Sequence, residues 1–319
     1  MTTPTSPDRL PEADAGRIAP TIQAIVEGDF SRSRLAALSD LDRSRVAYLR
    51  QHWLDIPPTE RHALLLALAE LADESIEFNF NRVFRVALAD SDPVIRQLAI
   101  GDLWEDNGED LSQTFLSILR NDASDDVRAT AADALSAVID AIAEGSSRAL
   151  DREELIQLFS EIIEDPGESP IVRRRALGAV AAFADDPRIP ELIRLSLDED
   201  DQTLVAGAIY AIGRTASVRW LSDLADFFQS EDAELRFEAA RAAGLIGDED
   251  VVPLLADLVY DADSEVRGAA IDALGSIGGP AAIRVLRQVE EDDEYEEAES
   301  VDDALDAALL TVNPLERHS

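Results

Sequence analysis

Apolar residues recur every three or four positions over most of the chain after residue 20, which is the spacing of one buried stripe on an α-helix. The stripes come in pairs, as in residues 59–68 followed by residues 76–88. The pairs are separated by short turns rich in Asp, Ser and Asn, whose side chains cap helix N-termini. The pattern predicts an all-α protein built from helix pairs.

One of these stripes is an internal repeat, because residues 122–135 recur with few changes as residues 261–274. Each copy contains a Val-Arg step near the start of its expected first helix. Counterparts of this position lie at Arg61, Arg96, Arg128, Arg173, Val205, Arg236 and Arg267. Their spacing of roughly 30 to 45 residues is typical of helical-pair solenoids. We therefore expect an α-solenoid of about seven to eight antiparallel helix pairs, stacked as one array.

The sequence divides this array into segments. We expect a flexible leader over residues 1–20, an atypical N-terminal repeat or cap over 21–56, the regular array over 57–290, an acidic linker over 291–300, a C-terminal capping helix over 301–312 and a tail over 313–319. The leader is proline-rich and has no apolar period, and the linker is a block of like charge that cannot pack on itself. The long interval between Arg128 and Arg173 predicts longer helices or an enlarged loop.

Composition sets further limits. Hydrophobic residues make up 46% of the chain and aromatic residues only 5%, so we expect a core of Ala, Leu, Ile and Val. The absence of cysteine excludes disulfides, thiolate metal sites and a cysteine nucleophile. We expect no signal peptide and no membrane span, since no run of about 18 apolar residues is present. A cytoplasmic protein is the expectation that follows.

The charge is strongly negative, with 28 basic residues against 66 acidic residues and a net charge of -38. All of the basic residues are arginines. Such a field repels phosphate backbones and anionic lipids, so neither nucleic acid nor a membrane is an expected partner. Two explanations of the acidity remain open: a hydrated surface of the kind found in salt-loving organisms, or a groove for a basic partner. The spread of acidic residues over the whole length favours the first explanation.

No residue pattern indicates chemistry. The three histidines, His52, His62 and His318, lack the spacing of a metal site and are expected on the surface. The glycine-rich stretch 275–279 does not have the order of a phosphate-binding loop, and the acidic loop 198–201 lacks the turn glycine of a calcium loop. We therefore predict no catalytic residue, no cofactor and no metal.

The array resembles the HEAT-repeat family, in its short form first named for phycobilisome bilin lyases. The resemblance covers roughly residues 57–290 and depends on first helices with Val-Arg-x-x-Ala-Ala-x-Ala-Leu-Gly and second helices with Pro-x-Leu-x-x-Leu. It implies a hydrogen-bonded ladder between an Asp before each first helix and the Arg within it. The residues expected in this structural ladder are Asp55, Arg61, Asp90, Arg96, Asp122, Arg128, Arg173, Arg236, Asp261 and Arg267. The pattern lapses at Val205, and where Gly167 and Ser230 precede an arginine.

The same architecture implies that second helices line the concave face. The helical period then predicts which residues of these helices point outward. Arg219 and Trp220, at the entrance to one of these helices, belong to the same predicted surface. The expected partner-binding residues are Arg194, Arg219, Trp220, Asp226, Gln229, Asp257 and Tyr260. Trp220 and Tyr260 are the candidate anchors, because aromatic residues are enriched at interface hot spots. The alternative for Trp220 is packing at a helix end.

These observations predict a non-catalytic scaffold or adaptor that binds a protein or peptide, with Arg or Lys on the partner, on the concave face. The alternative is a bilin-lyase-type enzyme subunit, or a chaperone for a cofactor-bearing protein. A third possibility is that the acidity serves only solvation and that the true contact is a small neutral patch. Iron-binding HEAT-like hydroxylases use His-Glu pairs. Because no histidine here is followed by Glu, the sequence disfavours a hydroxylase of that kind.

Overall fold

The computed structural model describes residues 12–103, 109–292 and 298–312 and confirms the all-α solenoid, since all of its regular elements in these ranges are helical. None of the described helices is long and apolar enough to cross a membrane. The chain divides into two compact units, Met1–Val138 and Ile139–Ser319.

Unit 1 begins with an irregular group of helices and continues with regular pairs. Its elements are α1 (Glu12–Val26), α2 (Arg32–Ala36), α3 (Arg43–His52), the 3-10 turn η1 (Trp53–Asp55), α4 (Pro58–Glu74), α5 (Asn81–Ala87), α6 (Pro93–Gly101), α7 (Glu109–Asn121) and most of α8 (Asp125–Ala143). The second helix expected over 76–88 begins only at Asn81, because the Asn79 side chain accepts from the Asn81 N–H at 3.1 Å. Ile76 is fully exposed in the preceding turn.

The expected leader boundary at residue 20 is wrong. Helix α1 starts at Glu12 and continues through Pro20. Ile18, Ile22 and Ile25 form one stripe at helical spacing, and all three are buried. Since α1 contacts α3, this burial offsets the backbone hydrogen bond that Pro20 cannot donate. Residues 1–11 of the predicted leader lie outside the described residues.

Unit 2 contains the end of α8 and the regular pairs that follow. Its elements are α9 (Arg152–Glu164), α10 (Pro170–Val180), η2 (Ala181–Phe183), α11 (Arg188–Leu197), α12 (Gln202–Arg214), η3 (Val218–Trp220), α13 (Leu221–Leu224), η4 (Ala225–Gln229), α14 (Ala233–Ile246), η5 (Glu249–Val251), α15 (Val252–Leu258), α16 (Ser264–Ile277), α17 (Gly279–Glu290) and α18 (Ala298–Val312). The long interval before Arg173 contains α8, which has 19 residues, and the loop that precedes α9.

Aspartates start three consecutive first helices of unit 2. The carboxylates of Asp201, Asp232 and Asp263 accept from the backbone N–H two positions later at 2.8, 2.9 and 2.9 Å. Each bond satisfies one of the N–H groups that a helix leaves free at its N-terminus. The turns between pairs therefore fix where α12, α14 and α16 begin.

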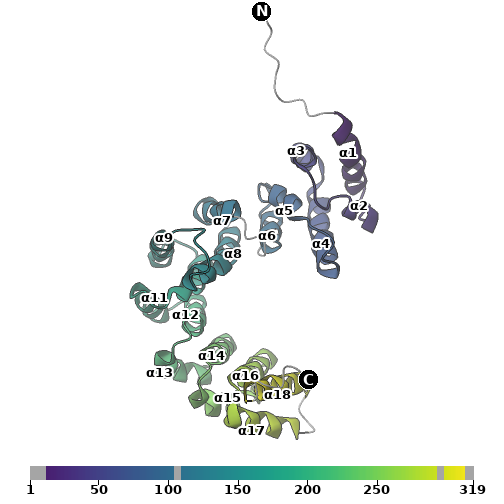
Figure 1. The fold of residues 1–319 in the computed structure, drawn as a ribbon. Coiled ribbons are helices and arrows are strands. Elements are labelled where there is room, and N and C mark those ends of the chain that lie inside the picture. The colour runs from purple at the N-terminus through teal and green to yellow at the C-terminus, as the bar shows by residue number, and fades with distance from the viewer. Residues whose placement is uncertain (1–11, 104–108, 293–297, 313–319) are drawn as a thin grey trace, which may run out of the picture. The chain divides into compact units, whose positions relative to one another are not determined.

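Within unit 2 the first helices form one layer and the second helices form another. Contacts link α10 to α12, α12 to α14, α14 to α16 and α16 to α18 in an unbroken series. Figure 1 shows α12, α14 and α16 on the inner side of the curve that this unit follows, with α11, α13 and α15 on its outer side. The expectation that second helices line the concave face is therefore wrong for unit 2.

Small residues explain why the first helices occupy the inner layer. A Cβ atom added at Gly213, Gly244 or Gly275 would lie only 2.7, 3.0 and 3.0 Å from a Cα atom of the next first helix. Those Cα atoms belong to Ala242, Ala273 and Ala304, respectively. The inner helices pack backbone to backbone at these points, which a curved stack requires of its inner layer.

Different glycines follow the ends of these helices. Gly244 and Gly275 lie inside α14 and α16, whereas Gly247 and Gly278 follow the two helix ends. Gly247 and Gly278 have φ angles of 72° and 63°, in the left-handed region that glycine adopts without strain.

The last helix continues the inner layer. α18 begins at Ala298, so the expected linker over 291–300 loses its last three residues, and residues 293–297 and the tail 313–319 lie outside the described residues. Val301, Ala304 and Ala308 of α18 are buried, and the helix contacts α16 and α17. Gly213, Gly244 and Gly275 recur at a constant interval, and the next position in that series is the exposed Asp306.

Candidate functional site

The ladder arginines pair with a carboxylate of the following repeat. Arg96 donates two hydrogen bonds to Asp122 at 2.8 and 2.6 Å, and Arg236 donates two to Asp261 at 2.7 and 2.8 Å. Arg61 forms a buried ion pair with Asp90 in the same way. The Arg236 guanidinium holds the pKa of the Asp261 carboxyl below its usual range. Each such pair joins two consecutive repeats.

Within a repeat, the arginine bonds to the backbone of the preceding turn and not to the aspartate side chain. Arg96 donates to the Asp90 carbonyl at 2.8 Å, Arg128 donates to the Asp122 carbonyl at 2.8 Å, and Arg267 donates to the Asp261 carbonyl at 2.9 Å. The six-residue spacing between Asp and Arg in the sequence therefore corresponds to a hydrogen bond from the arginine to the backbone carbonyl of that Asp. The side-chain carboxylate of the same Asp accepts from the arginine of the preceding repeat.

The remaining predicted ladder residues deviate for local reasons. Asp55 is exposed and bonds to His52 at 2.7 Å, outside the ladder. Arg128 pairs with Asp125 at 2.7 Å in its own helix. Arg173 pairs with Glu199 at 2.7 Å, a partner that the sequence analysis missed because it searched for Asp before Arg. Glu199 lies six positions before Val205, which is the place of the ladder Asp in other repeats, so this spacing could have identified it as the partner of Arg173.

The predicted partner-binding residues lie on the outer layer of unit 2 or in its turns. Exposed side chains belong to Arg194, Arg219, Asp226, Gln229, Asp257 and Tyr260. Trp220 is only 1% exposed, so its ring packs at a helix end and offers no anchor. The Arg194 and Arg219 guanidiniums each lie 5.1 Å from the centroid of that ring. These residues do not form a concave site.

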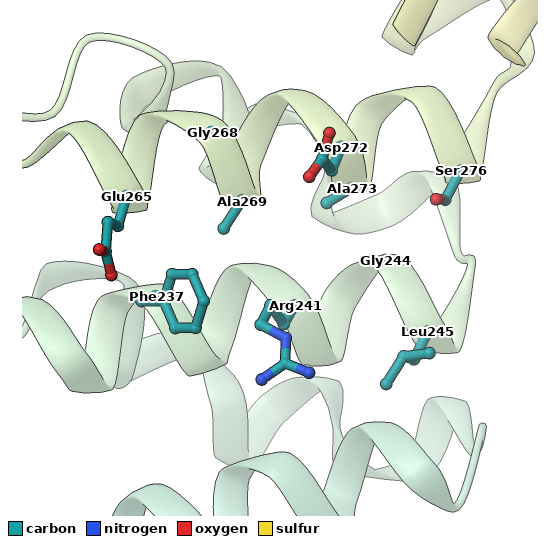
Figure 2. Close-up of a pocket in the computed structure, with 10 residues that line it drawn as sticks. All are labelled: Phe237, Arg241, Gly244, Leu245, Glu265, Gly268, Ala269, Asp272, Ala273 and Ser276. Carbon is teal, nitrogen blue, oxygen red and sulfur yellow. The ribbon is translucent and has the colours of Figure 1, made fainter. Parts of the chain in front are cut away.

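A groove lies instead on the inner layer, between α14 and α16. It has a volume of about 510 Å³, and Figure 2 shows the two helices that form its sides. It is lined by Phe237, Arg241, Gly244 and Leu245 of α14 and by Glu265, Gly268, Ala269, Asp272, Ala273 and Ser276 of α16. Leu245 is 50% exposed, although it is a large apolar side chain. This groove was not predicted, because the binding face was expected on the second helices.

A second hollow of about 350 Å³ adjoins the groove, since Phe237 and Glu265 line both. Glu238 lies in it and is only 3% exposed. Its carboxylate accepts from Arg174 of α10 at 2.9 Å and from Arg241 at 3.2 Å. Burial raises the pKa of Glu238, and the two arginines oppose this effect.

The cations of this face already have partners. Arg174 also donates to Glu234 at 2.5 Å. The Arg241 guanidinium lies 5.0 Å from the Tyr210 ring centroid and 5.4 Å from that of Phe237, within the range of cation–π attraction. Glu265 and Asp272, in contrast, are exposed and make no side-chain ion pair with any residue that the structure describes. The groove therefore combines apolar contact area with two unpaired carboxylates.

The arrangement fits the binding of a cationic ligand. The described residues contain no group of three or more His, Cys, Asp or Glu side chains placed to hold a metal ion. Among the groove residues, Phe237 and Leu245 offer apolar surface, and Glu265 and Asp272 offer charge-assisted hydrogen bonds, which are roughly twice as strong as neutral ones.

A family profile agrees with this architecture. The sequence profile of HEAT repeats matches residues 114–213 and 220–305, which is more than half of the chain. No curated protein matches the sequence significantly. Human deoxyhypusine hydroxylase, solved in complex with glycerol, is similar over 93% of this chain and 96% of its own, at 17% identity and a TM-score of 0.34. YibA of Escherichia coli is similar over 75% of this chain and 96% of its own, at 16% identity and a TM-score of 0.44. An engineered protein covers 94% of this chain and 92% of its own, at 18% identity and a TM-score of 0.42.

Proposed function

We propose that this chain, which belongs to the HEAT-repeat family, is a non-catalytic scaffold that binds a basic protein segment on the inner layer of unit 2. The observation that carries the proposal is the groove between α14 and α16, with its unpaired carboxylates Glu265 and Asp272. An arginine or lysine of a partner would meet each carboxylate, and the exposed Leu245 would cover apolar atoms of the same segment. A net charge of -38 would speed the approach of such a partner.

The proposal concerns two carboxylates and not the acidity as a whole. Acidic residues cover the entire chain, and most of them remain compatible with a solvation role. In the groove, Glu265 and Asp272 flank Gly268 and Ala269 on α16, and Figure 2 shows Glu265 extending toward Phe237 of α14. Specific binding therefore requires the groove, whereas nonspecific attraction requires only charge.

The test compares charge reversals in the groove and on the outer layer. The probe is a panel of fluorescein-labelled peptides that each carry two arginines, and the readout is fluorescence polarisation. Glu265→Arg should weaken binding of the best peptide by about tenfold or more, since a charge-assisted contact is replaced by repulsion. Asp257→Arg, on α15 of the outer layer, changes the net charge equally and should have a much smaller effect.

Two results would overturn the proposal. Equal losses for Glu265→Arg and Asp257→Arg would show that net charge alone attracts the peptides. A larger loss for Asp257→Arg would return the binding face to the second helices, where the sequence analysis placed it. Circular dichroism and thermal unfolding of both variants verify that each remains folded.

A further inference from the structure

We infer that the groove between α14 and α16 selects a segment in polyproline II conformation with basic residues at positions i and i+3. This inference rests on the proposed function and adds the conformation and spacing of the partner. It follows from four features of the groove: the separation of its carboxylates, the closeness of its two helices, the apolar side chains of α14, and the open space over Gly268.

The first feature is the separation of Glu265 and Asp272. They lie seven residues apart on α16, which places their Cα atoms about 10.5 Å apart along the helix axis. Seven residues are close to two full turns, so both side chains leave the same face of the helix. A polyproline II helix has three residues per turn and advances about 3.1 Å per residue. Its positions i and i+3 therefore share one face at a separation of about 9.3 Å, which matches the two carboxylates.

Other backbone conformations match less well. In a β-strand, residues i and i+3 point to opposite sides, and residues i and i+2 are only about 7 Å apart. An α-helical partner could present two basic residues at i and i+7, but its diameter is about 10–12 Å. The groove is narrow, because the backbones of α14 and α16 approach each other at Gly244 and Ala273. A polyproline II segment is thinner than an α-helix and enters such a groove more readily.

Helix α14, on the other side of the groove, favours an apolar residue between the two basic residues of the partner. Phe237 and Leu245 are eight positions apart on α14 and flank Arg241. Glu238 and the Tyr210 ring hold Arg241 in place, but its guanidinium stays partly exposed in the groove. A third basic residue between the two contacts would meet Arg241, and proline or an aliphatic residue fits there better. Polyproline II segments commonly dock in aromatic-lined grooves of this kind.

Gly268 lies between the two carboxylates and leaves space for the segment. No heavy atom lies within 4 Å of the place where a Cβ atom of residue 268 would be. Glycine costs an α-helix about 1 kcal/mol relative to alanine, and no neighbouring side chain requires it here. A side chain at this position would project into the groove between Glu265 and Asp272.

The experiment ranks the peptide panel by dissociation constant with the full-length protein. All peptides have the same length and the same two arginines in a proline-rich frame, and only the arginine spacing varies from i+1 to i+6. We expect the i+3 peptide to bind about tenfold more tightly than the others, since a mismatched peptide loses one charged contact. An alanine-rich helical peptide with arginines at i and i+7 should bind no better than the mismatched peptides.

Variants of the groove test the same inference. Gly268→Leu should abolish the preference for i+3, because the side chain fills the space between the carboxylates. Asp272→Asn changes no volume and should lower the i+3 affinity to that of the other spacings. Thermal unfolding verifies that both variants fold, and Gly101→Ala in unit 1, also at a glycine with open space around it, serves as the matched control.

The outcomes separate this inference from the proposed function. Equal affinity for all spacings, combined with a loss on Glu265→Arg, overturns the polyproline II inference and leaves the basic-segment proposal standing. Tightest binding by the helical i and i+7 peptide also overturns the inference. If Glu265→Arg changes no peptide affinity, both the inference and the proposed function are wrong.

Discussion

Arg174 of α10 and Glu238 of α14 are joined by a 2.9 Å hydrogen bond, although the intervening helix α12 separates their two repeats. Gly207 of α12 leaves the path open, because a Cβ atom there would lie 2.6 Å from Cγ of Arg174. A second such pair joins Arg214 of α12 to Asp140 of α8 at 2.5 Å. Contacts in a solenoid normally join nearest neighbours, so these pairs add coupling between next-nearest repeats.

Removing Arg174 should destabilise unit 2 more than the loss of an exposed ion pair would. Arg174→Leu leaves the buried Glu238 carboxylate with Arg241 as its remaining partner, and we expect a loss of about 2 kcal/mol in the free energy of unfolding. The double variant Arg174→Leu/Glu238→Leu should lose less than the sum of the two single variants, because it removes both charges together. Urea unfolding of the four proteins measures the coupling.

A matched control for that cycle is the exposed pair formed by Arg152 and Asp185 in the same unit, at 2.6 Å. Asp185→Asn should change the free energy of unfolding by less than about 1 kcal/mol, as is usual for exposed ion pairs. Strict additivity in the Arg174 and Glu238 cycle would show that the bond across α12 contributes no coupling.

The missing ladder pair between α12 and α14 can be restored. Val205 and Ser230 occupy the positions that hold Arg236 and Asp261 in the next pair. Val205→Arg alone should destabilise the protein, because its guanidinium would be largely buried without a carboxylate. Adding Ser230→Asp should recover about 1–3 kcal/mol, the worth of a hydrogen bond to a charged group. Equal stability of the single and double variants, measured by urea unfolding, would contradict the ladder geometry.

Two glycine-to-alanine substitutions should have opposite signs. In Gly213→Ala the new Cβ atom would lie 2.7 Å from the Ala242 backbone, so the helices must separate, and we expect a loss of about 1–3 kcal/mol. In Gly268→Ala the atom meets nothing within 4 Å, and the higher helix propensity of alanine should add up to about 1 kcal/mol. Thermal unfolding midpoints that fall for both variants would show that the inner layer tolerates no added methyl group anywhere.

Unit 1 should lose stability between mildly acidic and neutral pH. Burial, with a smaller contribution from Asp73, raises the pKa of Asp102 from 3.8 to about 6. A raised pKa means that the folded state holds this proton more tightly, so the stabilisation is complete below 3.8 and is lost as the pH rises through about 6. Asp102→Asn should therefore stabilise unit 1 at pH 8 by on the order of 1 kcal/mol, since the side chain is only half buried. Near pH 4 the same substitution should have little effect, and a gain of equal size at both pH values would contradict this assignment.

The repeat in the sequence predicted much of the fold because helix starts depend on local chemistry. Asp232 and Asp263 cap their helices within two residues, and the carbonyl contacts of Arg96 and Arg267 reach only six positions back. Such contacts depend on spacing along the chain, and spacing is visible in a sequence. The same locality explains why α14 and α16 could be placed without a structure.

The inner layer could not be predicted in the same way, because it depends on contacts between repeats. Gly213 and Gly244 let Ala242 and Ala273 of the next helix approach, and nothing in the local sequence around either glycine indicates this contact. Comparison of the small residues on first and second helices would have indicated which layer packs more closely. The burial of Trp220 was also undecided in the sequence, since a tryptophan at a helix end suits either a core or an interface.

The carboxylate of Asp306 limits how a chain of this kind can grow. A repeat inserted between α14 and α16 would meet Gly244 on one side and could offer its own glycine on the other, as the existing helices do. A helix packed on the other side of α18 would instead meet Asp306, where α12, α14 and α16 have glycine. The close backbone packing that joins α12, α14 and α16 is therefore excluded at residue 306, so a helix stacked on that side of α18 would have to lie farther away or tilt around the carboxylate.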